Sequence, residues 1–148
     1  MAGHPRQLTQ SEQGQQRPEW LTWDSYPFEL RTLSSPEGDI AYIEEGEGPP
    51  LLFVHVGMWS FVWRDVLVRL REGYRCIAID APGSGLSPAP TARVPGIAEA
   101  ATAVDRVVRH LDLNDVTLLF HDLGGPACLL ASGNWIDRVR LLVAINTF

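Results

Sequence analysis

The sequence predicts an α/β fold in which an N-terminal β-hairpin is followed by a mostly parallel sheet with helices on both faces. Short, continuous apolar runs recur along the chain, and runs of this kind form strands that are buried on both faces. They alternate with longer segments whose apolar residues recur at helical spacing. This alternation implies parallel strands joined by right-handed crossovers.

The first two elements are predicted to form the antiparallel hairpin. Residues 28–33 alternate enough for a strand, and residues 40–44 form its partner. Residues 34–39 between them carry the Ser, Pro and Gly that favour a turn.

The remaining elements build the parallel part of the sheet. Four apolar runs rich in β-forming residues predict buried strands at 51–56, 75–80, 116–120 and 140–145. Helices are expected at 59–71, 97–111 and 124–132. The 97–111 segment is the clearest of these, because Ala101, Val104 and Val108 fall on one stripe.

Length and composition indicate a single domain. The 148 residues are 45% hydrophobic, which suits one buried core. Residues 1–18 are polar and rich in Gln, so we expect a disordered tail, with the domain at 19–148. Both cysteines, Cys76 and Cys128, lie in apolar runs and are expected to be small buried hydrophobes without a disulfide.

Charge and spacing exclude several classes of function. The net charge is −6 and the 12 basic residues are scattered, which argues against a nucleic-acid surface. No apolar run approaches the roughly 20 residues of a membrane helix, so we expect no membrane partner and a cytoplasmic protein. No spacing suggests a metal site, and we expect neither a metal nor a cofactor.

One junction between a predicted strand and helix carries a reactive side chain. Residues 118–126 read Leu-Leu-Phe-His-Asp-Leu-Gly-Gly-Pro, which places Asp122 where the buried strand turns into the helix. A tight turn of this kind lifts one side chain out over the sheet, and Gly124 and Gly125 allow the helix to approach the strand. The helix N-terminus favours an anion there, and the Leu123 amide is placed to stabilise an oxyanion.

A second interpretation of Asp122 is open at this point. Aspartate is a favoured N-cap residue, so the side chain could simply cap the helix that follows. Under that interpretation, Asp122→Asn changes the free energy of unfolding by about 1 kcal/mol at most and alters no activity.

The order of six segments resembles a known family. They are Tyr-Pro-Phe-Glu at 26–29, the stretches 43–55 and 59–65, Tyr-Arg-Cys-Ile-Ala-Ile-Asp-Ala-Pro-Gly-Ser-Gly-Leu-Ser at 74–87, His-Asp-Leu-Gly-Gly-Pro at 121–126, and Ile-Asn-Thr-Phe at 145–148. Together they resemble the N-terminal half of the α/β-hydrolase superfamily, most closely the haloalkane dehalogenases and next the epoxide hydrolases.

The resemblance implies a mechanism for Asp122. Its carboxylate would attack an electrophilic carbon and form an alkyl ester on the enzyme, which a histidine-activated water then hydrolyses. The segment His55-Val56-Gly57 occupies the place of the family's oxyanion loop, and Leu123 and Gly124 belong to the nucleophile turn. The implied substrate of a completed enzyme is a small apolar molecule.

The sequence also departs from the family. Leu123 stands where dehalogenases carry a tryptophan that holds the halide, and Asn146 stands where some members carry the catalytic acid. The resemblance stops before the family's cap, its last strands and its catalytic histidine, so we expect a truncated fold. Two hypotheses follow: a hydrolase with Asp122 as nucleophile, or a non-catalytic remnant. The apolar strand at 141–145 is expected to be an exposed edge through which chains associate.

Overall fold

The computed structural model describes residues 12–36, 38–89 and 96–148. The strands of its seven-stranded sheet are β1 (Glu12–Gly14), β2 (Arg31–Leu33), β3 (Ile40–Glu45), β4 (Pro50–His55), β5 (Arg75–Ile79), β6 (Val116–Asp122) and β7 (Val139–Thr147). The helices are α1 (Arg64–Leu70), α2 (Ile97–His110) and α3 (Gly124–Ser132), with 3-10 turns η1 (Ser60–Trp63) and η2 (Ile136–Arg138).

The sheet order confirms the predicted architecture. The strands lie in the order β1-β2-β3-β5-β4-β6-β7. The β2–β3 hairpin is antiparallel, and β3 also pairs antiparallel with β5. From β5 through β4 and β6 to β7 every pairing is parallel, as expected for strands joined by helices.

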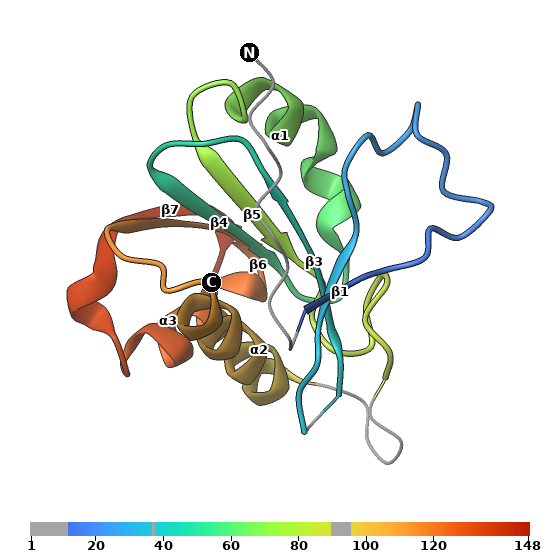
Figure 1. The fold of residues 1–148 in the computed structure, drawn as a ribbon. Coiled ribbons are helices and arrows are strands. Elements are labelled where there is room, and N and C mark those ends of the chain that lie inside the picture. The colour runs from blue at the N-terminus through green and yellow to red at the C-terminus, as the bar shows by residue number, and fades with distance from the viewer. Residues whose placement is uncertain (1–11, 37, 90–95) are drawn as a thin grey trace.

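Helices cover both faces of the sheet, as predicted (Figure 1). On the face of α2 and α3, alternate side chains such as Leu52 and Val54 pack with Val104 of α2. On the face of η1 and α1, the intervening side chain Phe53 packs with Leu67. Both helical layers therefore follow from the period-two alternation of β4. None of the described helices is both long and apolar enough to cross a membrane.

Two predicted elements begin at least three residues later than expected. The segment expected as one helix at 59–71 begins with the 3-10 turn η1 and only then continues as α1. The strand expected from residue 28 begins at Arg31. The Phe28 amide donates to the nearby Tyr26 carbonyl (2.9 Å), so it is not available to pair with a neighbouring strand. Phe28 and Leu30 are nevertheless buried in the core, which explains why their pattern resembled a strand.

The described part of the segment expected to be a disordered tail, residues 12–18, lies against the hairpin. β1 pairs antiparallel with β2, and the Gln15 amide donates to the Leu30 carbonyl (3.0 Å). The Arg17 guanidinium donates to the Phe28 carbonyl (2.6 Å) and lies over the Trp23 ring, 3.8 Å from its centroid. Backbone pairing and one long cationic side chain hold this segment to the hairpin, and neither produces a hydrophobic signal in the sequence. Residues 1–11 lie outside the described ranges.

Candidate active site

The turn between β6 and α3 has an unusual backbone conformation at Asp122. Asp122 ends the strand with φ = 52°, in the left-handed region that non-glycine residues rarely adopt. That conformation costs most L-residues about 1–2 kcal/mol, and the short polar side chain of aspartate tolerates it better than most. Strain held at a strand-to-helix junction is the feature that lifts a side chain out of the sheet.

Asp122 does not cap the helix. The N-cap position of α3 is occupied by Leu123, whose side chain makes no capping hydrogen bond. The capping interpretation of Asp122 is therefore wrong, because the carboxylate belongs to the strand end that precedes the cap.

Close packing around the turn explains both glycines. A Cβ atom at Gly124 would lie 2.5 Å from the Val54 carbonyl oxygen of β4, and one at Gly125 would overlap the Thr147 hydroxyl of β7. The same hydroxyl donates a hydrogen bond to the Asp122 carbonyl (2.6 Å). The predicted approach of α3 to the strands is confirmed, and β7 holds the strained peptide in place.

The Asp122 carboxylate is available for chemistry. The side chain is half-buried, and no hydrogen bond joins its oxygens to another described residue. The amide of Leu123 likewise donates to no group in the described ranges. A half-buried anion beside the N-terminus of a nine-residue helix is favoured by the helix dipole.

The sheet brings the predicted oxyanion loop to the same edge. β4 and β6 are parallel neighbours, so His55 and His121 lie side by side where both strands end. Val56 then packs against a small cluster that includes Ala127 of α3, and Gly57 turns the chain with φ = 89°. All six predicted site residues thus gather around the carboxyl ends of β4 and β6, where ligands bind in open α/β sheets.

The two histidines form a hydrogen-bonded pair. Nδ1 of His121 lies 2.9 Å from Nε2 of His55, and Nδ1 of His55 lies 2.9 Å from the Val56 carbonyl oxygen. Burial lowers the pKa of His55, and the nearby His121 lowers it further, while the Val56 carbonyl and the Asp122 charge oppose the shift. The ring of Trp63 stands nearly perpendicular to that of His121, with 6.5 Å between centroids.

Sequence reasoning missed two supporting residues. Thr147 contacts the turn only because β7 pairs with β6, and no local signal marks it. Asp80 is buried at the end of β5, and its carboxylate accepts hydrogen bonds from the amides of Ser60 and Leu86 (2.8 Å each). Burial raises the pKa of Asp80. Its place in the Asp-x-x-Gly-x-Gly-x-Ser loop was the signal available.

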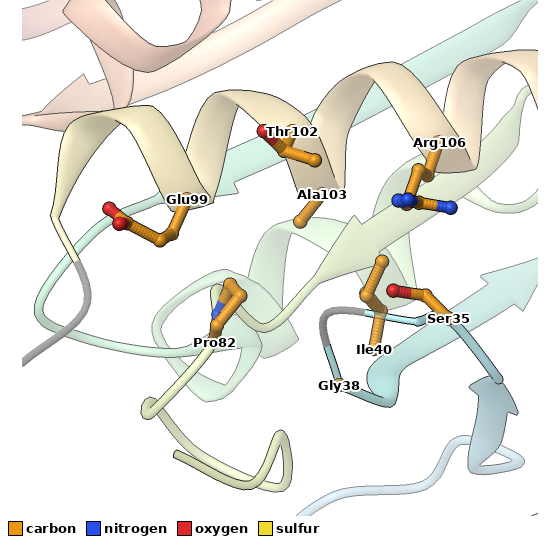
Figure 2. A pocket seen from close by; sticks show the side chains of 8 residues that line it. All are labelled: Ser35, Gly38, Ile40, Pro82, Glu99, Thr102, Ala103 and Arg106. Atoms are coloured by element: carbon orange, nitrogen blue, oxygen red, sulfur yellow. The ribbon is translucent and has the colours of Figure 1, made fainter. Parts of the chain in front are cut away.

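A small cavity lies elsewhere in the molecule. It measures about 60 Å³ and is lined by Ser35, Gly38, Ile40, Pro82, Glu99, Thr102, Ala103 and Arg106. Figure 2 shows side chains of α2 on one side of it and Pro82 and the β2–β3 turn on the other. Ligand pockets usually measure about 300–1,000 Å³, so this cavity is too small for a substrate. Within the described ranges, no group of three or more His, Cys, Asp or Glu side chains is arranged to hold a metal ion.

Comparisons with known proteins agree with the geometry. Residues 49–148 match the family model of the alpha/beta hydrolase fold. Haloalkane dehalogenase 2 of Mycobacterium tuberculosis is 41% identical over 124 residues, covering 83% of this chain and 43% of that protein. The chain therefore spans about two fifths of that relative's length.

Solved structures show the same likeness. The haloalkane dehalogenase DatA of Agrobacterium tumefaciens superposes with a TM-score of 0.73 at 28% identity, covering 80% of this chain and 40% of that one. The epoxide hydrolase CorEH superposes with a TM-score of 0.72 at 27% identity, over 80% and 42% of the two chains. With the turn at Asp122 and the mostly parallel sheet described above, these matches establish that the chain belongs to the α/β-hydrolase fold family.

Proposed function

We propose that this chain carries the nucleophile of a haloalkane dehalogenase-like hydrolase, with Asp122 forming an alkyl-enzyme ester. The observation that carries the proposal is the left-handed Asp122 (φ = 52°) between β6 and α3. Its half-buried carboxylate has no hydrogen-bond partner among the described residues. The 41% identical relative from Mycobacterium tuberculosis, a haloalkane dehalogenase, supports the substrate class.

The proposed step is a displacement at carbon. One carboxylate oxygen of Asp122 attacks the carbon that bears the halogen, a carbon–oxygen bond forms, and the carbon–halogen bond breaks. The halide leaves with the electron pair, and an aspartyl ester remains on the protein. Hydrolysis of that ester needs a base that activates water. The two ring nitrogens of His55 are already engaged by Val56 and His121, so His55 is not that base.

Opening of an epoxide ring by the same carboxylate is a second candidate. Leu123 follows the nucleophile with an apolar side chain that is 36% exposed, so this position offers no side-chain donor to a departing halide. In ring opening the leaving oxygen stays attached to the alkyl group and takes a proton from a water molecule, which leaves hydroxide, so no halide has to be bound. The resemblance to CorEH is in line with this alternative.

Intact-protein mass spectrometry tests the nucleophile. Incubation with a primary alkyl bromide should add one alkyl group to the chain, and peptide mapping should place it on Asp122. Incubation with a terminal epoxide should add the whole epoxide mass if ring opening is the reaction. Asp122→Asn should abolish either adduct.

Asp115 provides a matched control. It is an exposed aspartate that immediately precedes β6, and like Asp122 it has a left-handed backbone (φ = 54°). Asp115→Asn should leave adduct formation unchanged. Absence of any adduct on Asp122 with bromide and epoxide alike would refute a competent nucleophile and favour the non-catalytic remnant.

A further inference from the structure

The end of β4 and the end of β6 are joined by a chain of hydrogen bonds that begins beside the nucleophile. His121 immediately precedes Asp122, and its ring reaches across to His55 on the neighbouring strand. The ring of His55 reaches on to the carbonyl of Val56. The His121 side chain at the end of β6 is therefore connected, through His55, to the backbone of the loop that follows β4.

The direction of the hydrogen bonds follows from the chemistry of the three groups. A carbonyl oxygen only accepts, so Nδ1 of His55 carries the proton and donates to Val56. The His55 ring is buried, which favours its neutral form and leaves Nε2 as an acceptor. Nδ1 of His121, 2.9 Å away, must then carry a proton and donate.

This arrangement orients one backbone amide. The Val56–Gly57 peptide is trans, so its N–H points opposite to its carbonyl. Holding the Val56 oxygen toward His55 therefore turns the Gly57 N–H away from the histidines. That amide donates to no group in the part of the chain described, and a Cβ at Gly57 would meet nothing within 4 Å. The loop thus presents an amide donor that has no partner within the described ranges.

We propose that His121 is a positioning residue that acts through His55 to orient the Gly57 amide as an oxyanion donor opposite that of Leu123. The catalytic part of this inference rests on the proposed role of Asp122, whereas the hydrogen-bond chain itself does not. A preorganised donor contributes to catalysis because it needs no rearrangement when negative charge develops. The ring of Trp63, nearly perpendicular to that of His121, packs beside the ring from which the hydrogen-bond chain begins.

Nitrogen-15 NMR of the histidine rings in the 148-residue chain tests the hydrogen-bond chain without any reaction. In the wild type, His55 should carry its proton on Nδ1 with Nε2 free of a proton, and Nδ1 of His121 should carry a proton. A His55 ring protonated on Nε2, or one that averages between tautomers, would overturn the proposal. The presence or absence of an Asp122 adduct is measured separately, so failure of the positioning chain and failure of the nucleophile are distinguishable.

Two variants separate positioning from packing. His121→Leu removes the donor, so His55 should sample both tautomers and the Gly57 amide resonance should move. In His121→Asn the side-chain amide nitrogen takes the place of Nδ1 as the donor to His55. This variant should restore the wild-type tautomer of His55 and the wild-type position of the Gly57 amide resonance. His110→Gln, at the far end of α2, should change neither. A folded His121→Leu chain with an unmoved Gly57 resonance would also overturn the proposal.

Discussion

At Gly124, helix α3 lies against the backbone of β4, and Gly124→Ala tests that packing directly. The added Cβ would lie 2.5 Å from the Val54 carbonyl oxygen, whereas ordinary contact begins at 3.4 Å. The helix and strand must therefore separate by about 0.9 Å. The contacted atom is main chain in a strand that pairs on both sides with β5 and β6, so it has little freedom to move.

The expected effect combines two opposing contributions. Alanine improves helix propensity by about 1 kcal/mol. Overpacking of a rigid interface costs about 1–3 kcal/mol, and a clash with paired backbone falls at the upper end of that range or above it. We expect Gly124→Ala to lower the free energy of unfolding by about 2 kcal/mol.

Gly133 at the other end of the same helix is the matched control. Its φ is −53°, and an added Cβ would meet only the Leu130 carbonyl oxygen, at 3.6 Å. Gly133→Ala should therefore raise the free energy of unfolding by about 0.5–1 kcal/mol. Urea unfolding followed by tryptophan fluorescence reports both variants, since Trp135 is buried. Equal or greater stability of Gly124→Ala relative to the wild type would refute the packing argument.

Three further outcomes are expected. The left-handed backbone at Asp122 makes Asp122→Gly more stable than Asp122→Ala by about 1–2 kcal/mol in the same urea assay, and equal stabilities would show that no strain is stored there. The fold lowers the pKa of His55, so as the pH falls below about 6.5 the unfolded chain binds a proton at this residue before the folded chain does. The free energy of unfolding should therefore decline between about pH 6.5 and the lower pKa of the folded state, and the decline should be smaller in His55→Gln. An unchanged decline in the variant would show that other groups cause it. Among the described strands, β7 pairs only with β6, and it exposes Leu141 (54%), Leu142 (41%) and Ile145 (39%). The chain should therefore self-associate in size-exclusion chromatography, and Leu142→Lys should reduce the association. A monomer that binds no apolar dye would contradict the expectation.

Much of the fold was predictable because it depends on neighbours in the chain. The apolar stripe of α2 and the small-residue run of α3 mark those helices to within one residue, because helical periodicity is local. The buried strands and the β2–β3 hairpin are likewise marked by short apolar runs and turn residues. The short strand β1 at Glu12–Gly14 has no counterpart among the predicted strands, because backbone pairing of a polar segment has no apolar signature.

In the candidate site, too, some features were predictable from neighbouring residues in the chain and others were not. By itself the sequence determined which residue stands between strand and helix, Asp122, and which glycines let the two approach. Only the tertiary structure decided that Asp122 adopts φ = 52° outside the helix cap, that Thr147 holds its peptide, and that His121 meets His55, 66 positions earlier. Those features arise from the parallel register of β6 with β4 and β7. Parallel strands are joined by long crossover connections, so their contacts link residues that are distant in the chain, and neither strand's own sequence shows which side chains will meet.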